Sequence, residues 1–127
     1  MKERLRRYAR LLTEIELETN RNAALSDFEG YRHVRAREGI SDRLRRLQAA
    51  ETAEHAALVR MIEALPCAEQ RQVIFARYFD GHSWAQVAAV LFGRYADFYE
   101  KAESYERRVY RLHGNALANL NRIEAGE

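Results

Sequence analysis

The chain has 127 residues and a formal net charge of +2, and this length suits one domain or one small domain with a helical appendage. One proline and six glycines favour helices over a turn-rich β fold, so we expect an all-α protein. The sequence has no apolar run of about 18 residues, which excludes a membrane span. A single cysteine, Cys67, excludes an internal disulfide and fits the reducing cytoplasm.

Residues 2–25 are predicted to form the first helix, because apolar side chains recur near helical spacing at Leu5, Leu12, Ile15 and Leu25. The first turns also carry the arginines Arg4, Arg6, Arg7 and Arg10. Such a run usually forms a solvated helix face, and a phosphate-binding arm is the alternative. Cations near a helix N-terminus oppose the helix dipole at a cost of a few tenths of a kcal/mol, which mildly favours a second use for them.

The segment from Ser26 to Ile40 contains two glycines and an irregular apolar pattern, which predicts a loop. Ser41 or Asp42 can then cap a second long helix that runs to about Leu65, before Pro66. The apolar stripe of this helix consists of Leu44, Leu47, Leu58, Ile62 and Leu65, with Glu51 and Glu54 where a continuous heptad would have leucines. Two long amphipathic helices bury their stripes on each other or on a partner chain. We therefore predict a helical hairpin over residues 1–65 that also pairs two chains in a homodimer.

The second predicted unit, residues 66–127, begins with a helix from Cys67 to Phe79. Gly81 can adopt the left-handed conformation that ends this helix. Ser83, with Gln86 three residues later, forms a capping box, so the next helix begins at Trp84. One face of that helix carries Trp84, Val87, Ala88 and Leu91. We accordingly expect Trp84 to be a core residue rather than a ligand platform.

After Gly93 the apolar residues step by threes and fours as far as Ile123. The set comprises Tyr95, Phe98, Ala102, Tyr105, Val109, Leu112, Ala116, Leu120 and Ile123. One long helix from about Tyr95 to Ile123 would place them on a single stripe, and we favour this extended last helix. The alternative is a loop followed by a new helix capped by Ser104. The predicted architecture is a hairpin of long helices followed by a helix-turn-helix with an extended last helix.

The last helix carries the candidate DNA-binding residues. With Val109 facing inward, Arg107 and Arg111 point outward, and the flanking positions are held by Arg108, Tyr110 and Asn115. Arginine can bond guanine with two parallel donors and asparagine suits adenine, so these residue types match major-groove recognition of double-stranded DNA. The alternative is that the arginines are solvated and pair with Glu103 and Glu106. Gly114 on the outward face suggests close backbone approach, although a surface glycine without a role fits as well.

Catalysis finds little support in the sequence. The histidines His33, His55, His82 and His113 are scattered, and Cys67 has no second cysteine with which to build a zinc site. Ser83 lies near His82 in the sequence, but capping already explains it. We therefore expect no enzyme activity, no catalytic residue, no metal and no cofactor.

The C-terminal half resembles region 4 of bacterial sigma factors, and more closely the small phage late-gene activators of the RinA/ArpU type. The residues that carry this resemblance are Leu65, Pro66, Arg77, Tyr78, Gly81, Ser83, Trp84, Ala88, Val109, Arg111, Leu112, His113, Ala116 and Leu117. The junction from Phe92 to Ser104 is longer than the short turn of those proteins. The resemblance implies a phage or prophage transcriptional regulator that activates late or packaging genes in the cytoplasm of a bacterial host cell.

Two other functions remain open from the sequence. One is a DNA-binding accessory of phage packaging. The other is a protein-binding adaptor that grips RNA polymerase or a sigma factor without DNA contact, and the altered junction after Phe92 favours it. A DNA-binding regulator is also expected to contact RNA polymerase.

Overall fold

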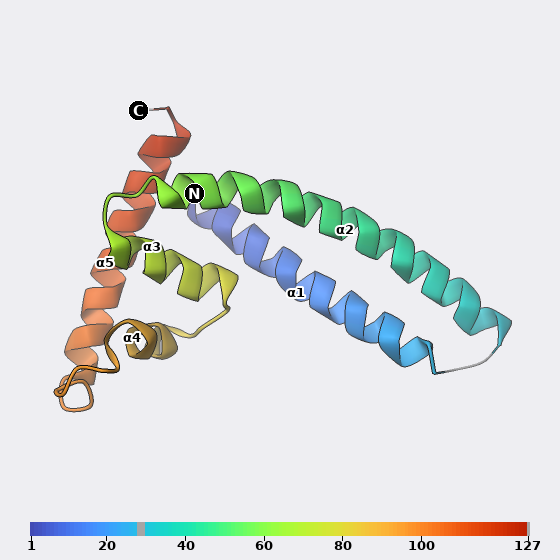
Figure 1. The fold of residues 1–127 in the computed structure, drawn as a ribbon, viewed down its shortest axis with the longest axis horizontal. Coiled ribbons are helices and arrows are strands. Elements are labelled where there is room, and N and C mark those ends of the chain that lie inside the picture. The colour runs from blue at the N-terminus through green and yellow to red at the C-terminus, as the bar shows by residue number, and fades with distance from the viewer. Residues whose placement is uncertain (28–29, 127) are drawn as a thin grey trace.

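The computed structural model describes residues 1–27 and 30–126, and every regular element in these ranges is a helix, which confirms the predicted all-α fold. The elements follow in the order α1 (Lys2–Leu25), α2 (Tyr31–Glu63), α3 (Ala68–Ile74), the π-helical turn η1 (Phe75–Phe79), α4 (Trp84–Phe92) and α5 (Ala102–Glu124). The long helices α1 and α2 lie side by side as a rod, and α5 crosses the base of this rod (Figure 1). None of the helices in the described ranges combines the length and the apolar character that a membrane span requires.

The predicted loop over residues 26–40 is wrong from Tyr31 onward, because α2 begins there and Ser41 and Asp42 lie inside it. Gly30 precedes the helix with a φ of 123°, which suits glycine. A glycine inside a helix, such as Gly39, costs about 1 kcal/mol relative to alanine. Packing outweighs this cost, since Ile40 is fully buried within the hairpin. Residues 28–29 of the predicted loop lie outside the described residues.

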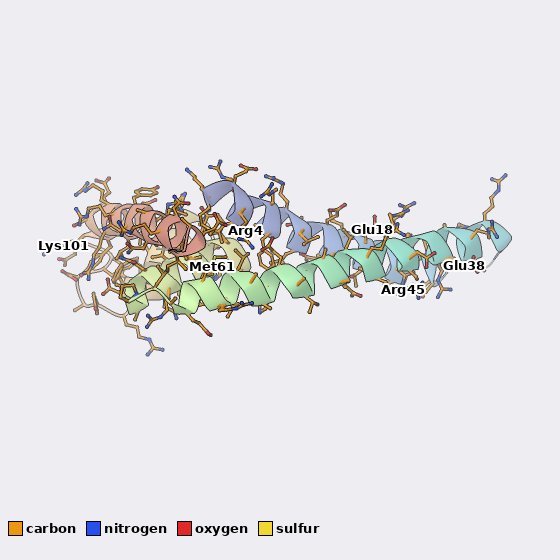
Figure 2. The ribbon with its side chains drawn as sticks, turned by 90° about the horizontal axis from the view of Figure 1, so that it is seen from above. Arg4, Glu18, Glu38, Arg45, Met61 and Lys101 are labelled. Atoms are coloured by element: carbon orange, nitrogen blue, oxygen red, sulfur yellow. The ribbon has the colours of Figure 1, made fainter. Side chains whose placement is uncertain are left out.

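The two glutamates that interrupt the apolar stripe of α2 both have partners on α1. The Tyr8 hydroxyl donates to Glu51 Oε1 at 2.7 Å, and Arg4 donates to Glu54 Oε1 at 2.6 Å. Arg4 also donates to Glu124 at the end of α5 at 2.7 Å. Figure 2 shows Arg4 at the base of the hairpin, beside α5. Arg4 thus joins three helices and is unlike the other arginines in the first turns of α1.

The base of the hairpin shares a core with the C-terminal unit. This core consists of Leu5, Tyr8, Leu58, Ile62, Leu65, Ile74, Tyr78, Ala116 and Leu120. A second core fastens α4 to α3 and α5 and consists of Val73, Ala76, Val87, Ala88, Phe92, Phe98 and Val109. Trp84 is only partly buried against this second core, so its predicted core position holds in part. The side chains that position α5 therefore come from both halves of the chain.

The turn between the third and fourth helices forms as the local sequence predicts. The Asp80 amide donates to the Phe75 carbonyl at 2.9 Å, a five-residue spacing that makes the end of the helix π-helical. Gly81 then adopts a φ of 73°, and α4 begins at Trp84. The capping box is confirmed: Ser83 Oγ accepts from the Gln86 amide at 3.2 Å, and Gln86 Oε1 accepts from the Ser83 amide at 2.9 Å.

The predicted helical start at Tyr95 is wrong, because α5 begins at Ala102 with Lys101 before it, and Ser104 is not its cap. Residues 93–101 form turns instead. The aromatic rings of this segment pack back onto the helices. The ring centre of Tyr95 lies 5.9 Å from that of Phe92, and the ring centre of Phe98 lies 5.7 Å from that of Tyr105. A compact aromatic cluster thus replaces the straight continuation that the apolar period predicts.

Candidate nucleic-acid interface

α5 has an inward face that fixes the direction of every other side chain on it. Val109, Ala116 and Leu120 are fully buried, and His113 is nearly so. At 3.6 residues per turn, the opposite face carries Arg107, Arg111, Gly114, Asn115 and Ala118, all of which are exposed. We call these five residues the outer face of α5.

Arg107 and Arg111 project from this outer face into solvent. Within residues 1–27 and 30–126, no carboxylate lies within ion-pair distance of either guanidinium, so pairing with Glu103 or Glu106 does not occur there. Asn115 is exposed on the same face. The two guanidinium groups and the amide keep their donors available for a ligand.

Tyr110 borders the outer face. Its side chain is 47% exposed, and its hydroxyl donates to Glu106 Oε1 at 3.2 Å. Its ring lies 5.3 Å from the ring of Trp84, in an edge-on arrangement. Tyr110 therefore joins the outer face of α5 to the start of α4.

Arg108 lies on the other side of α5 and has a structural role. It donates to both carboxylate oxygens of Glu69 at 3.1 Å. Its guanidinium also lies 4.7 Å from the centre of the Phe92 ring. Of the five predicted site residues, Arg107, Arg111 and Asn115 share one face and Tyr110 borders it, whereas Arg108 fastens α5 to α3 and α4. Helical spacing on α5 does not predict this role, because Glu69 lies 39 residues away in the sequence.

Behind Tyr110, a buried polar pair supports the start of α4. Tyr78 and His113 approach to 2.7 Å between the hydroxyl and Nε2. Burial, and after it the charges of Lys2, Arg77 and Arg6, lower the pKa of His113 from 6.5 to about 4. His113 is therefore neutral at pH 7, with Nε2 free to accept the Tyr78 hydroxyl proton.

Arg77 is fixed in place beside this pair. Its guanidinium lies 4.4 Å from the centre of the Trp84 ring and donates to the His82 carbonyl at 2.9 Å. Asp80 follows Arg77 three residues later in the sequence, a spacing at which two side chains on a helix can pair. In the described part of the chain it forms no ion pair with Asp80, and its partners are a backbone carbonyl and an aromatic ring.

Cations from the first turns of α1, for which the sequence left a phosphate-binding role open, lie beside the turn before α4. Lys2, Arg6 and Arg10 line a cleft of about 360 Å³, and Arg77 and His82 line its other side. The arginine run near the start of α1 was the only signal, and the sequence could not show that this run lies beside the turn before α4.

Comparisons with protein-family models, with curated proteins and with solved structures give no match. Within residues 1–27 and 30–126, no group of three or more histidine, cysteine, aspartate or glutamate side chains is arranged to hold a metal ion.

Proposed function

We propose that the chain is a DNA-binding transcriptional regulator of phage or prophage origin that places α5 in the major groove. The observation that carries this proposal is the outer face of α5, where Arg107 and Arg111 are exposed and form no ion pair within the described residues. Desolvating two arginines is favourable where the partner supplies acceptors in matching geometry, and base edges and phosphates both do so.

The dimensions and side chains of α5 suit this role. An α-helix with its side chains is about 10–12 Å across, and the major groove is about 12 Å wide. Gly114 and Ala118 have small side chains, so the helix backbone in the middle of the outer face can approach a ligand closely. The space beside Gly114 is open, because a Cβ there would meet no atom within 4 Å. Arg111 and Asn115 lie one turn apart on the same helix, so both can reach base edges in one approach.

The proposed regulator acts as a homodimer that pairs through the outer part of the hairpin. Of the described residues between 9 and 57, only Ile40 is fully buried, and Leu17 remains 62% exposed. Half-buried leucines along a two-helix rod favour association with a second copy. Two copies of α5 would then address half-sites about 34 Å apart or a multiple of this distance.

The choice of target genes comes from the resemblance alone. The residues from Leu65 to Leu117 that resemble phage late-gene activators extend the proposal to activation of late or packaging genes. A packaging accessory would use the same outer face of α5 on DNA, so the two roles differ in which DNA is bound.

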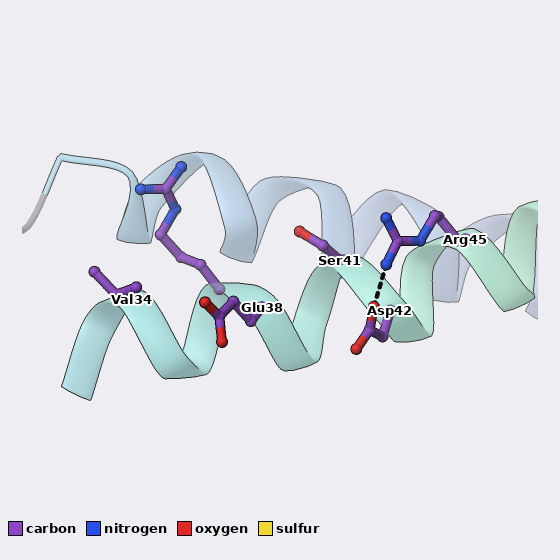
Figure 3. Close-up of a pocket in the computed structure, with 6 residues that line it drawn as sticks. Val34, Glu38, Ser41, Asp42 and Arg45 are labelled. Carbon is purple, nitrogen blue, oxygen red and sulfur yellow. Dashed lines mark hydrogen bonds and ion pairs between the residues drawn. The ribbon is translucent and has the colours of Figure 1, made fainter. Parts of the chain in front are cut away.

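The proposal is tested by DNA binding of the parent chain and two double variants. Arg107→Ala/Arg111→Ala removes two charges from α5, whereas Arg45→Ala/Arg46→Ala removes two charges from the hairpin. Arg45 pairs with Asp42 on α2 (Figure 3), far from α5 (Figure 2). Fluorescence anisotropy would compare duplexes from upstream of the neighbouring genes with random duplexes.

We expect the parent chain to prefer one upstream duplex. Loss of two base contacts at 1 kcal/mol or more each should weaken that binding by about 30-fold or more. The hairpin variant should bind like the parent. A parent chain that binds no duplex would refute the proposal, and equal binding by the α5 variant would refute the role of its outer face.

A second candidate function is a protein-binding adaptor that acts on RNA polymerase or a sigma factor. The observation that favours it is the apolar surface around the junction, where Tyr99 is 88% exposed and Val90 and Tyr95 are more than half exposed. Val90 and Tyr95 line a groove of about 330 Å³ between α3 and α4. If this function is correct, Val90→Glu abolishes binding to polymerase while the α5 double variant retains it.

A further inference from the structure

The cleft between α1 and the turn before α4 gathers cations from segments that are far apart in the sequence. Lys2, Arg6 and Arg10 face it from the first turns of α1, and Arg77 faces it from η1. The packing of α1 on η1 produces this arrangement, because Leu5 and Tyr8 share a core with Tyr78.

Most of the charge in this cleft is not neutralised. In the part of the chain that the structure describes, no carboxylate pairs with Lys2, Arg6 or Arg77, whereas Arg10 pairs with Glu3 at 3.1 Å. Arg77 is also held in one position by the His82 carbonyl. The charges act together, since Lys2, Arg77 and Arg6 each lower the pKa of the nearby His113 beyond the effect of burial.

This cleft is a direct neighbour of the outer face of α5. Trp84 lines the cleft, and its ring lies 5.3 Å from the ring of Tyr110, which borders the outer face. A ligand that extends along the surface from Arg111 past Tyr110 reaches the cleft next. A DNA strand is such a ligand, because it carries a phosphate at every nucleotide.

We propose that the cleft binds backbone phosphates of the same DNA that α5 contacts, with Lys2 and Arg6 as its principal ligands. This inference rests on the proposed function and assigns a second contact to it. Phosphate contacts fix the position of a protein on the duplex and carry no base preference. The hairpin thereby sets the register in which α5 meets the bases. It also gives a role to cations that are unfavourable beside a helix N-terminus.

Neighbouring arginines on α1 provide a matched test. Arg6 and Arg7 are both exposed and carry the same charge, but only Arg6 lines the cleft. The full-length variants Arg6→Ala, Arg7→Ala and Lys2→Ala would be titrated against an upstream duplex and a random duplex at several salt concentrations. Thermal unfolding of each variant would verify that the fold is kept.

We expect Arg6→Ala and Lys2→Ala to weaken binding to both duplexes by the same factor. Each should reduce the magnitude of the negative slope of log affinity against log salt concentration by about 1, as for one lost phosphate contact. Arg7→Ala should leave the slope unchanged. Equal effects of Arg6→Ala and Arg7→Ala, or no effect of Arg6→Ala and Lys2→Ala, would overturn the inference.

The two proposals can fail separately. If the parent chain binds DNA and Arg111→Ala weakens it while the slope with Arg6→Ala stays at the parent value, only the phosphate cleft is refuted. If the parent chain binds no duplex at any salt concentration, the proposed function fails and the cleft proposal fails with it.

Discussion

The buried pair of Tyr78 and His113 makes the stability of the chain depend on pH in a direction that the structure fixes. His113 has a pKa of about 4 in the folded chain, against 6.5 as its ordinary value. The unfolded chain therefore binds a proton between pH 6.5 and pH 4 that the folded chain does not bind. Stability from this group is fully present above about pH 6.5 and is lost as the pH falls through this window.

The size of the loss in the free energy of unfolding follows from the difference between the folded and unfolded pKa values of His113. Each unit of pKa difference corresponds to about 1.4 kcal/mol, so the free energy of unfolding should fall by about 3 kcal/mol between pH 6.5 and pH 4. The carboxylates of Glu3 and Asp97 also have lowered pKa values, through hydrogen bonds from Arg10 and Tyr105, respectively. They contribute to acid destabilisation as well, so the effect of His113 must be isolated by a variant.

His113→Gln is the suitable variant because glutamine has a similar size, can accept from Tyr78 and does not titrate. Urea unfolding at a series of pH values, followed by the fluorescence of the single tryptophan Trp84, would give the free energy of unfolding of both chains. The difference between parent and variant should shrink by about 3 kcal/mol from pH 7 to pH 4. A difference that stays constant with pH would show that His113 is not buried as a neutral acceptor.

Three further substitutions have expected outcomes. Gly114→Ala should raise the free energy of unfolding by about 1 kcal/mol in thermal or urea unfolding, since the added Cβ meets open space. The same variant should weaken DNA binding if the backbone of α5 approaches the groove closely. Arg108→Ala should cost about 1 kcal/mol through its lost contacts with Glu69 and Phe92, and should leave the salt dependence of DNA binding unchanged. Leu17→Glu should convert a dimer to a monomer in sedimentation at tens of micromolar (roughly the range of weak interfaces), and an unchanged mass would place the dimer contact elsewhere.

The features that the sequence predicts correctly are those with local causes. Gly81 adopts the left-handed conformation because its φ is set by a tight turn, and Ser83 and Gln86 cap α4 through residues three apart. The outward direction of Arg107 and Arg111 likewise follows from helical spacing, once Val109 is known to face inward.

The features that the sequence does not predict depend on contacts between distant segments. Residues 31–40 are helical because packing on helix α1 compensates for Gly39, and nothing local in the sequence indicates that packing. The apolar steps from Tyr95 fit a helix as well as they fit a turn in which Tyr95 and Phe98 pack back on neighbouring rings. Periodicity alone cannot distinguish these two arrangements.

The same distinction holds within the candidate site. Arg108 and Arg111 look equivalent in the sequence, but Glu69 of α3 binds the first and no described carboxylate binds the second. Arg4 and Arg6 differ in the same way, because Arg4 pairs with Glu54 and Glu124 while Arg6 lines the cleft. The role of each arginine was therefore set by tertiary packing, which a helical wheel does not contain.

The outer face of α5 is tested most directly by the base preference of Arg111→Ala. The parent chain and the variant would be titrated against the preferred duplex and against duplexes with single base-pair changes at each position. If Arg111 reads a base, the variant should lose about 1–3 kcal/mol on the preferred duplex and lose its preference at one base pair, with random DNA less affected. A variant with the affinity and the base preferences of the parent would contradict the assignment of α5 to the major groove.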